Sequence, residues 1–136
     1  MNFKQQFHEW FYSSEVWKET SYSKIPCQKC PFDLWNYQEI IFEYDIGLVI
    51  EFGILNGGST KYFSDILRSA SDSYRVVGFD INLDNLHPEV KDLNNVEIYK
   101  QDTASECLQD KLIDIKSRFN FPTLFLLDSE HTKSHV

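Results

Sequence analysis

The segment that decides the fold is LVIEFGILNGGSTK, residues 48–61. It begins with the apolar run Leu48–Ile50, which predicts a strand buried on both faces, as in a parallel sheet. A glycine-rich turn follows and leads into the amphipathic run KYFSDILRSA, for which Ser59 and Thr60 are candidate N-caps. Strand, glycine turn and helix together form the first unit of a nucleotide-binding α/β fold.

Three glycines and one acidic residue give this turn its chemical character. Because glycine lacks a Cβ atom, Gly53, Gly57 and Gly58 would let a ligand lie against bare backbone, beside the unpaired N–H groups of a helix start. Glu51 precedes the turn, and the dinucleotide motif G-x-G-x-x-G is absent. A carboxylate here would repel a pyrophosphate and attract a cationic cofactor. S-adenosylmethionine (SAM) meets this requirement, because it carries a sulfonium and an ammonium group. The alternative is a turn whose glycines only permit close packing.

The composition indicates one acidic, globular domain. A chain of 136 residues is long enough to bury a core, and a hydrophobic content of 42% opposes global disorder. The net charge of -8 opposes binding to nucleic acid or to an anionic membrane. Because there is no apolar run of about 18 residues and no signal peptide behind Met1, we expect a cytoplasmic protein without membrane insertion.

Three cysteines, an odd number, do not indicate a disulfide framework. Cys27 and Cys30 form a lone C-x-x-C within residues 21–31, a segment that two prolines mark as an irregular link. A structural zinc site needs four ligands, and a redox pair normally opens a helix after a strand. We therefore expect two reduced thiols here, and we expect Cys107 to be buried in a later helix.

The other elements alternate between helices and strands. Aromatic residues at helical spacing predict an amphipathic helix within residues 1–20, whose aromatic face either packs on the main domain or a partner, or forms a lid over an acceptor. Further helices are expected at 31–44 and 104–119, and further strands at 75–80, 95–100 and 123–127. This pattern divides the chain into an N-terminal helix and linker, 1–30, and a Rossmann-like domain, 31–136.

An acidic residue lies at the end of each strand: Glu51, Asp80, Asp102 and Asp128. Right-handed crossovers between parallel strands place all four at one edge of the sheet. The crevice should open where the strand order reverses, between the first and fourth strands, with Glu51 and Asp128 beside it. Asp80 is expected to accept hydrogen bonds from ribose hydroxyls, or alternatively to cap the following turn, and Gln101 and Asp102 are expected to border an adenine.

Four blocks of sequence, taken together, resemble a known family. They are CPFDLWNYQEII (30–41), VIEFGILNGGSTKYFSDIL (49–67), VVGFDI (76–81) and LFLLDSEHTKSHV (124–136). In this order they resemble the cephalosporin hydroxylase and rhamnosyl O-methyltransferase family, which includes the macrocin O-methyltransferases. Members are class I SAM-dependent methyltransferases, and some require magnesium and methylate a sugar hydroxyl.

The resemblance implies a SAM-dependent, Mg²⁺-assisted O-methyltransferase for a saccharide, glycolipid or glycosylated small molecule, with a role in lipid or polysaccharide biosynthesis. It also implies a role for each matching residue: Glu51, Gly53, Gly57, Gly58 and Ser59 line the methionine end of the cofactor, Asp80 holds the ribose, Asp102 lies near the adenine, Asp128 binds the metal, and His131 is the base.

This chemistry is physically reasonable because a sugar hydroxyl is about as hard to deprotonate as water, whose pKa is about 15.7. Mg²⁺ held by Asp128 would lower that pKa, and His131 could accept the proton at neutral pH. The alternatives are an N-cap role for Asp128 and a solvated side chain for His131. His131 and His135 could also be a zinc pair, but the glutamate of H-E-x-x-H is missing.

The chain is shorter than the family pattern. Two further acidic metal ligands would lie beyond Val136, and the fourth strand would be an apolar edge, so the expected fold is partial and truncated after the fourth strand. A second hypothesis is a catalytically incompetent fragment that binds the cofactor or a partner. A third, an iron oxygenase, lacks an H-x-D/E pattern with a distant histidine. The sequence leaves homo-oligomer formation open.

Overall fold

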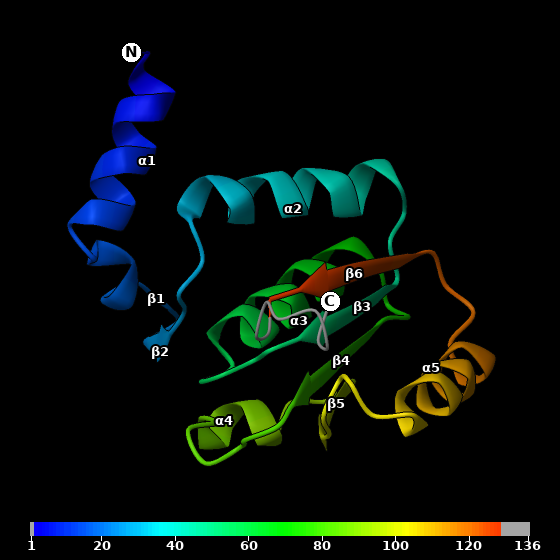
Figure 1. Ribbon diagram of the computed structural model, residues 1–136. Coiled ribbons are helices and arrows are strands. Elements are labelled where there is room, and N and C mark those ends of the chain that lie inside the picture. The colour runs from blue at the N-terminus through cyan, green and yellow to red at the C-terminus, as the bar shows by residue number, and fades with distance from the viewer. Residues whose placement is uncertain (1, 129–136) are drawn as a thin grey trace.

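The computed structural model describes residues 2–128, which form a four-stranded parallel sheet with helices on both faces (Figure 1). The strands are β3 (Leu48–Phe52), β4 (Arg75–Asp80), β5 (Val96–Lys100) and β6 (Thr123–Leu127). They lie in the order β5-β4-β3-β6, and every pairing is parallel. The chain runs outward from β3 to β5 and then returns to β6 on the other side of β3. The predicted reversal of strand order between the first and fourth strands is therefore confirmed.

Helices α2 and α3 cover one face of the sheet, and α5 covers the other (Figure 1). The helical elements are α1 (Phe3–Ser13), η1 (Val16–Lys18), α2 (Pro31–Glu43), α3 (Gly58–Ala70), α4 (Pro88–Lys91) and α5 (Cys107–Arg118). The predicted irregular link contains a small antiparallel hairpin of β1 (Ser21–Tyr22) and β2 (Ile25–Pro26). Strands of two residues are too short to show a period, so the sequence pattern could not predict this hairpin.

Strand β3 is buried on both faces, as its unbroken apolar run predicts. Leu48, Ile50 and Phe52 pack in a cluster with Ile115 of α5. Val49 points to the opposite face, into the cluster formed by α2 and α3. Because side chains alternate along a strand, Glu51 lies on the same face as Val49, under α3.

Helix α3 begins at the glycine turn, with Gly57 as its N-cap. Gly57 has a φ of +87°, and a Cβ atom there would lie 2.8 Å from side-chain atoms of Leu86 and Val90. The prediction that Ser59 or Thr60 caps the helix is wrong, because both lie inside its first turn and their hydroxyls donate to Glu51 instead.

Helix α5 packs on the sheet with the predicted face. Ile115 is fully buried, and the partly buried side chains around it include Leu108, Leu112 and Phe119. Cys107 is exposed, so the prediction of a buried Cys107 is wrong; it is the first residue of α5, where the chain enters the helix. None of the helices within residues 2–128 combines the length and apolarity needed to cross a membrane.

Candidate functional site

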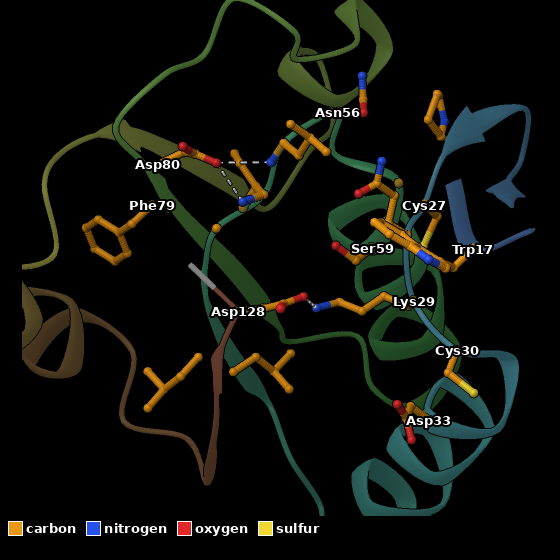
Figure 2. A pocket seen from close by; sticks show the side chains of 18 of the residues that line it. Trp17, Cys27, Lys29, Cys30, Asp33, Asn56, Ser59, Phe79, Asp80 and Asp128 are labelled. Atoms are coloured by element: carbon orange, nitrogen blue, oxygen red, sulfur yellow. Dashed lines mark hydrogen bonds and ion pairs between the residues drawn. The ribbon is translucent and has the colours of Figure 1, made fainter. Parts of the chain in front are cut away.

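A cavity of about 600 Å³ opens at the carboxyl edge of the sheet (Figure 2). One side is formed by the glycine turn after β3 and the ends of β4 and β6; the other is formed by residues of α1, η1, β2 and the start of α2. Ligand sites for small molecules typically have volumes of roughly 300–1,000 Å³. The cavity also lies where the strand order reverses, which is the usual position of a ligand in an open α/β sheet.

Glu51 is fully buried and does not belong to the cavity wall. Its carboxylate accepts a hydrogen bond from the Ser59 hydroxyl and another, of 3.0 Å, from the Thr60 hydroxyl. Burial raises the pKa of the Glu51 carboxyl, and the charge of Lys29 and the two hydroxyl hydrogen bonds oppose that rise. Since Ser59 does line the cavity, it lies between the buried carboxylate and the ligand space.

Asp80 lines the cavity and also holds the glycine turn in shape. Its Oδ2 atom accepts the backbone N–H groups of Ile54 and Leu55 at 2.9 and 3.0 Å (Figure 2). Its Oδ1 atom accepts the backbone N–H of Asn82 at 3.2 Å. Leu55 has a φ of +46°, an uncommon value for a residue with a side chain. A carboxylate oxygen can accept two hydrogen bonds, so Oδ1 retains capacity for a ribose hydroxyl.

The three glycines of the turn differ in what they contact. Gly53 and Gly58 line the cavity, whereas Gly57 packs against Leu86 and Val90. A Cβ atom at Gly58 would lie 2.4 Å from the carbonyl oxygen of Pro26, so this glycine also permits the hairpin to approach α3. The close-packing alternative thus describes Gly57 and part of the role of Gly58.

The loop after β5 contributes Gln101 and Thr103 to the wall, but not Asp102. The Oδ1 atom of Asp102 accepts the backbone N–H of Ala104 at 2.9 Å. Glu51, Gly57 and Asp102 do not line the cavity, and the roles given to them at the cofactor stay predictions. The predicted base His131 lies outside the described residues, as does His135.

Asp128 lies in the wall directly after β6, and its backbone N–H donates to the carbonyl of Phe52 at 2.9 Å. The Nζ atom of Lys29 donates to the Asp128 carboxylate and forms an ion pair with it (Figure 2). The Lys29 side chain is only 11% exposed, against 50% for that of Asp128. Lys29 is the residue that the sequence analysis missed, and the only signal for it was its position between Cys27 and Cys30, which are both buried.

Lys29 faces two carboxylates. Burial would lower the pKa of its ammonium group, but the charge of Glu51 and the hydrogen bond with Asp128 raise it above the ordinary value. Glu51 and Asp128 lie on the same face of the sheet because side chains alternate along a strand. Leu126 pairs with Glu51, and Asp128 follows Leu126 by two residues. One ammonium group is therefore influenced by two acidic side chains, Asp128 in the cavity wall and Glu51 buried behind it.

The remaining wall is aromatic and acidic. Tyr12, Trp17 and Tyr37 line the cavity together with Asp33. Cys27 and Cys30 are free thiols in the same wall, and burial raises the pKa of Cys27. Within residues 2–128, no group of three histidine, cysteine or acidic side chains is arranged to hold a metal ion.

A parallel sheet with a glycine turn and a cavity at its switch point defines a Rossmann-like α/β domain. Residues 14–136 match the family model described as Rhamnosyl O-methyltransferase/CmcI. The chain belongs to this family, which confirms the resemblance seen in the four sequence blocks.

Curated relatives agree with this assignment, and solved structures agree with the fold. Rhamnosyl O-methyltransferases of Mycobacterium tuberculosis (strain H37Rv) and Mycobacterium leprae are 33% and 31% identical over 132 residues, which is 97% of this chain and 54% and 57% of theirs. A CmcI structure with Mg and SAM superposes with a TM-score of 0.67 at 19% identity, covering 85% of this chain and 47% of that one. A CmcI apo-structure superposes with a TM-score of 0.70 at 20% identity, covering 86% of this chain and 48% of that one. The chain spans about half the length of the curated relatives it matches.

Proposed function

We propose that this chain binds SAM and belongs to an O-methyltransferase that transfers the methyl group of SAM to a hydroxyl of a saccharide. The observation that carries the proposal is the cavity at the switch point, lined by Gly53, Ser59, Asp80 and Asp128, in a member of the rhamnosyl O-methyltransferase/CmcI family. The relatives are named rhamnosyl O-methyltransferases, which supports a sugar hydroxyl as the acceptor.

The volume of the cavity and the chemistry of its wall support SAM as the ligand. Gly53 and Gly58 bring bare backbone to its wall, Asp80 has an oxygen with capacity for a ribose hydroxyl, and Gln101 and Thr103 would border the adenine. The cofactor supplies an electrophilic methyl group on a positively charged sulfur atom. Glu51 lies behind Ser59, so its negative charge would act on that sulfonium through the hydroxyl that separates them.

Asp128 is the described residue that would hold Mg²⁺. Its carboxylate offers the hard oxygen atoms that Mg²⁺ prefers, and an ammonium group already occupies the position of a cation beside it. Bound Mg²⁺ would lower the pKa of an acceptor hydroxyl. Asp128 is a single ligand among the described residues, so water, the acceptor and residues elsewhere would complete the coordination shell. We keep His131 as the proposed base.

The aromatic wall would receive the acceptor. The rings of Tyr12, Trp17 and Tyr37 offer apolar faces against which the C–H face of a sugar can pack, while Asp33 can accept hydrogen bonds from its hydroxyls. In this arrangement, the N-terminal segment contributes to the acceptor site, as the lid hypothesis requires.

Calorimetric titration with S-adenosylhomocysteine, with and without Mg²⁺, tests the cofactor part of the proposal. Asp80→Ala should weaken binding by ~1–3 kcal/mol, because it removes a hydrogen bond to the ligand and also loosens the glycine turn. Asp72→Ala, which removes an exposed carboxylate far from the turn, is the matched control. No heat at millimolar ligand would refute cofactor binding. Binding without turnover on a panel of rhamnosides would favour the incompetent fragment.

A further inference from the structure

The ion pair between Lys29 and Asp128 is unusual in its position. The Lys29 side chain starts in the segment between β2 and α2 and crosses to the end of β6, so it joins the two sides of the cavity (Figure 2). Its neighbours Cys27 and Cys30 are buried at 4% and 2% exposure, which fixes the backbone on either side. The ammonium group is thus delivered to one carboxylate by a well-packed segment.

We propose that the Lys29 ammonium group and a divalent cation compete for the carboxylate of Asp128. This inference rests on the proposed metal role of Asp128. Lys29 is then a positioning residue: it neutralises and orients Asp128 until a metal ion arrives, and it must move when the ion binds.

Electrostatics and geometry support competition rather than joint binding. Nζ of Lys29 donates to Oδ2 of Asp128, so an ion bound by this carboxylate has to share it with the ammonium group or displace that group. A divalent ion placed there would also stand within a few ångströms of the ammonium charge, and like charges at such a distance repel each other. The four-carbon stem of lysine is flexible, so its tip can withdraw without movement of the backbone.

Glu51 is a second carboxylate whose negative charge acts on Lys29, and it lies on the same face of the sheet as Asp128. Its charge, like the contact with Asp128, favours the ammonium form of the lysine. A displaced Lys29 therefore remains beside a negative charge, which limits the cost of its movement. The expected result is a metal site that is weakened, but not blocked, by its own lysine.

Manganese titration, followed by the relaxation of water protons, tests the proposal on the full chain. Lys29→Gln should bind Mn²⁺ about tenfold more tightly than the unaltered chain, because it removes both the competing cation and its repulsion. Lys100→Gln, which removes an equal charge from an exposed position at the end of β5, should change the affinity less than about twofold. Adding Asp128→Asn to Lys29→Gln should abolish the gain.

The outcomes separate this inference from the proposed function. If Asp128→Asn weakens Mn²⁺ binding but Lys29→Gln fails to tighten it, competition is refuted while the metal role of Asp128 stands. If Asp128→Asn leaves Mn²⁺ binding unchanged, the metal role itself is refuted, and competition with it. Neither result bears on the binding of S-adenosylhomocysteine, which is measured separately.

A measurement on the unaltered chain guards against misfolding of the Lys29 variants. In protein labelled with ¹⁵N-lysine, an ammonium group held in an ion pair gives a resolved NMR signal, and the Lys29 signal is assigned by its loss in Lys29→Arg. Saturating Mg²⁺ should shift or remove this signal and leave the other lysine signals in place. A Lys29 signal that stays unchanged at saturating Mg²⁺ would overturn the proposal.

Discussion

The two walls of the cavity are built in different ways. The sheet wall comes from strand ends and the glycine turn, where the acidic side chains are held by direct hydrogen bonds: Asp80 by three backbone N–H groups and Glu51 by two hydroxyls. The N-terminal wall comes from a helix, a short hairpin and irregular chain, and it carries rings, two thiols and Lys29. The two walls are joined by the ion pair between Lys29 and Asp128.

This difference suggests a division of labour. A wall made of the carboxyl ends of parallel strands is rigid and suits the proposed cofactor, because ligands of open α/β sheets bind at these strand ends. A wall made of loops and rings can vary without disturbing the sheet, so it suits the acceptor, which sets specificity. Changes to the sheet wall should therefore affect stability and cofactor binding, whereas changes to the N-terminal wall should affect binding of the acceptor.

The largest effect is expected at the glycine turn. Gly57→Val should destabilise the chain by about 2–5 kcal/mol, because a left-handed φ strains a β-branched residue and the new side chain overlaps Leu86 and Val90. Urea denaturation measures the loss, with Ala104→Val in an exposed loop as the control. A loss below about 1 kcal/mol would mean that the turn is more adaptable than a rigid cofactor wall requires.

The buried carboxylate behind the turn should have the next largest effect. Glu51→Ala is expected to cost about 2–3 kcal/mol, since it leaves a cavity and deprives the hydroxyls of Ser59 and Thr60 of their acceptor. Glu43→Ala, at an exposed position on α2, is the control, and both variants are compared by urea denaturation. If Glu51→Ala were as stable as its control, Glu51 would not be the anchor of the sheet wall.

The same contrast between the walls explains which parts of the structure could be predicted from the sequence. The strands at 75–80 and 123–127 were predicted within their observed bounds because each is an apolar run closed by an acid or a turn. The burial of the Glu51 side chain was harder to predict. An acid at a strand end is visible in the sequence, but whether it lies under α3 depends on which face of the strand it occupies and on two hydroxyls in the next helix. Lys29 could not be found, because its role depends on a contact with Asp128, which lies 99 residues away.

For the N-terminal wall, Trp17→Ala should weaken saccharide binding by about 1–2 kcal/mol, because a large ring face is removed from the proposed acceptor site. Binding of S-adenosylhomocysteine should stay within about twofold of the unaltered chain, since the sheet wall is untouched. Titration with a methyl rhamnoside in the presence of S-adenosylhomocysteine, followed by NMR, gives both values. Trp35→Ala removes a ring that is 65% exposed and outside the cavity, and it serves as the control. Equal losses in both variants would remove the distinction between the walls.

The smallest effect is expected far from either wall, at Glu97 on β5, whose carboxylate accepts two hydrogen bonds from Arg118 at 2.9 and 3.0 Å. These contacts lower the pKa of Glu97 below its ordinary value of 4.5, so the ion pair stabilises the fold above that pH. Glu97→Gln should cost about 1 kcal/mol at pH 7, a value kept small by the half-exposed Arg118. As the pH falls below about 4.5 and through the lowered pKa, the difference between the two proteins should shrink to nothing, because the carboxyl becomes protonated in both the folded and the unfolded state. Urea denaturation from pH 3 to pH 7 measures this trend, and a difference that persists at the acid end would assign the effect to packing rather than to charge.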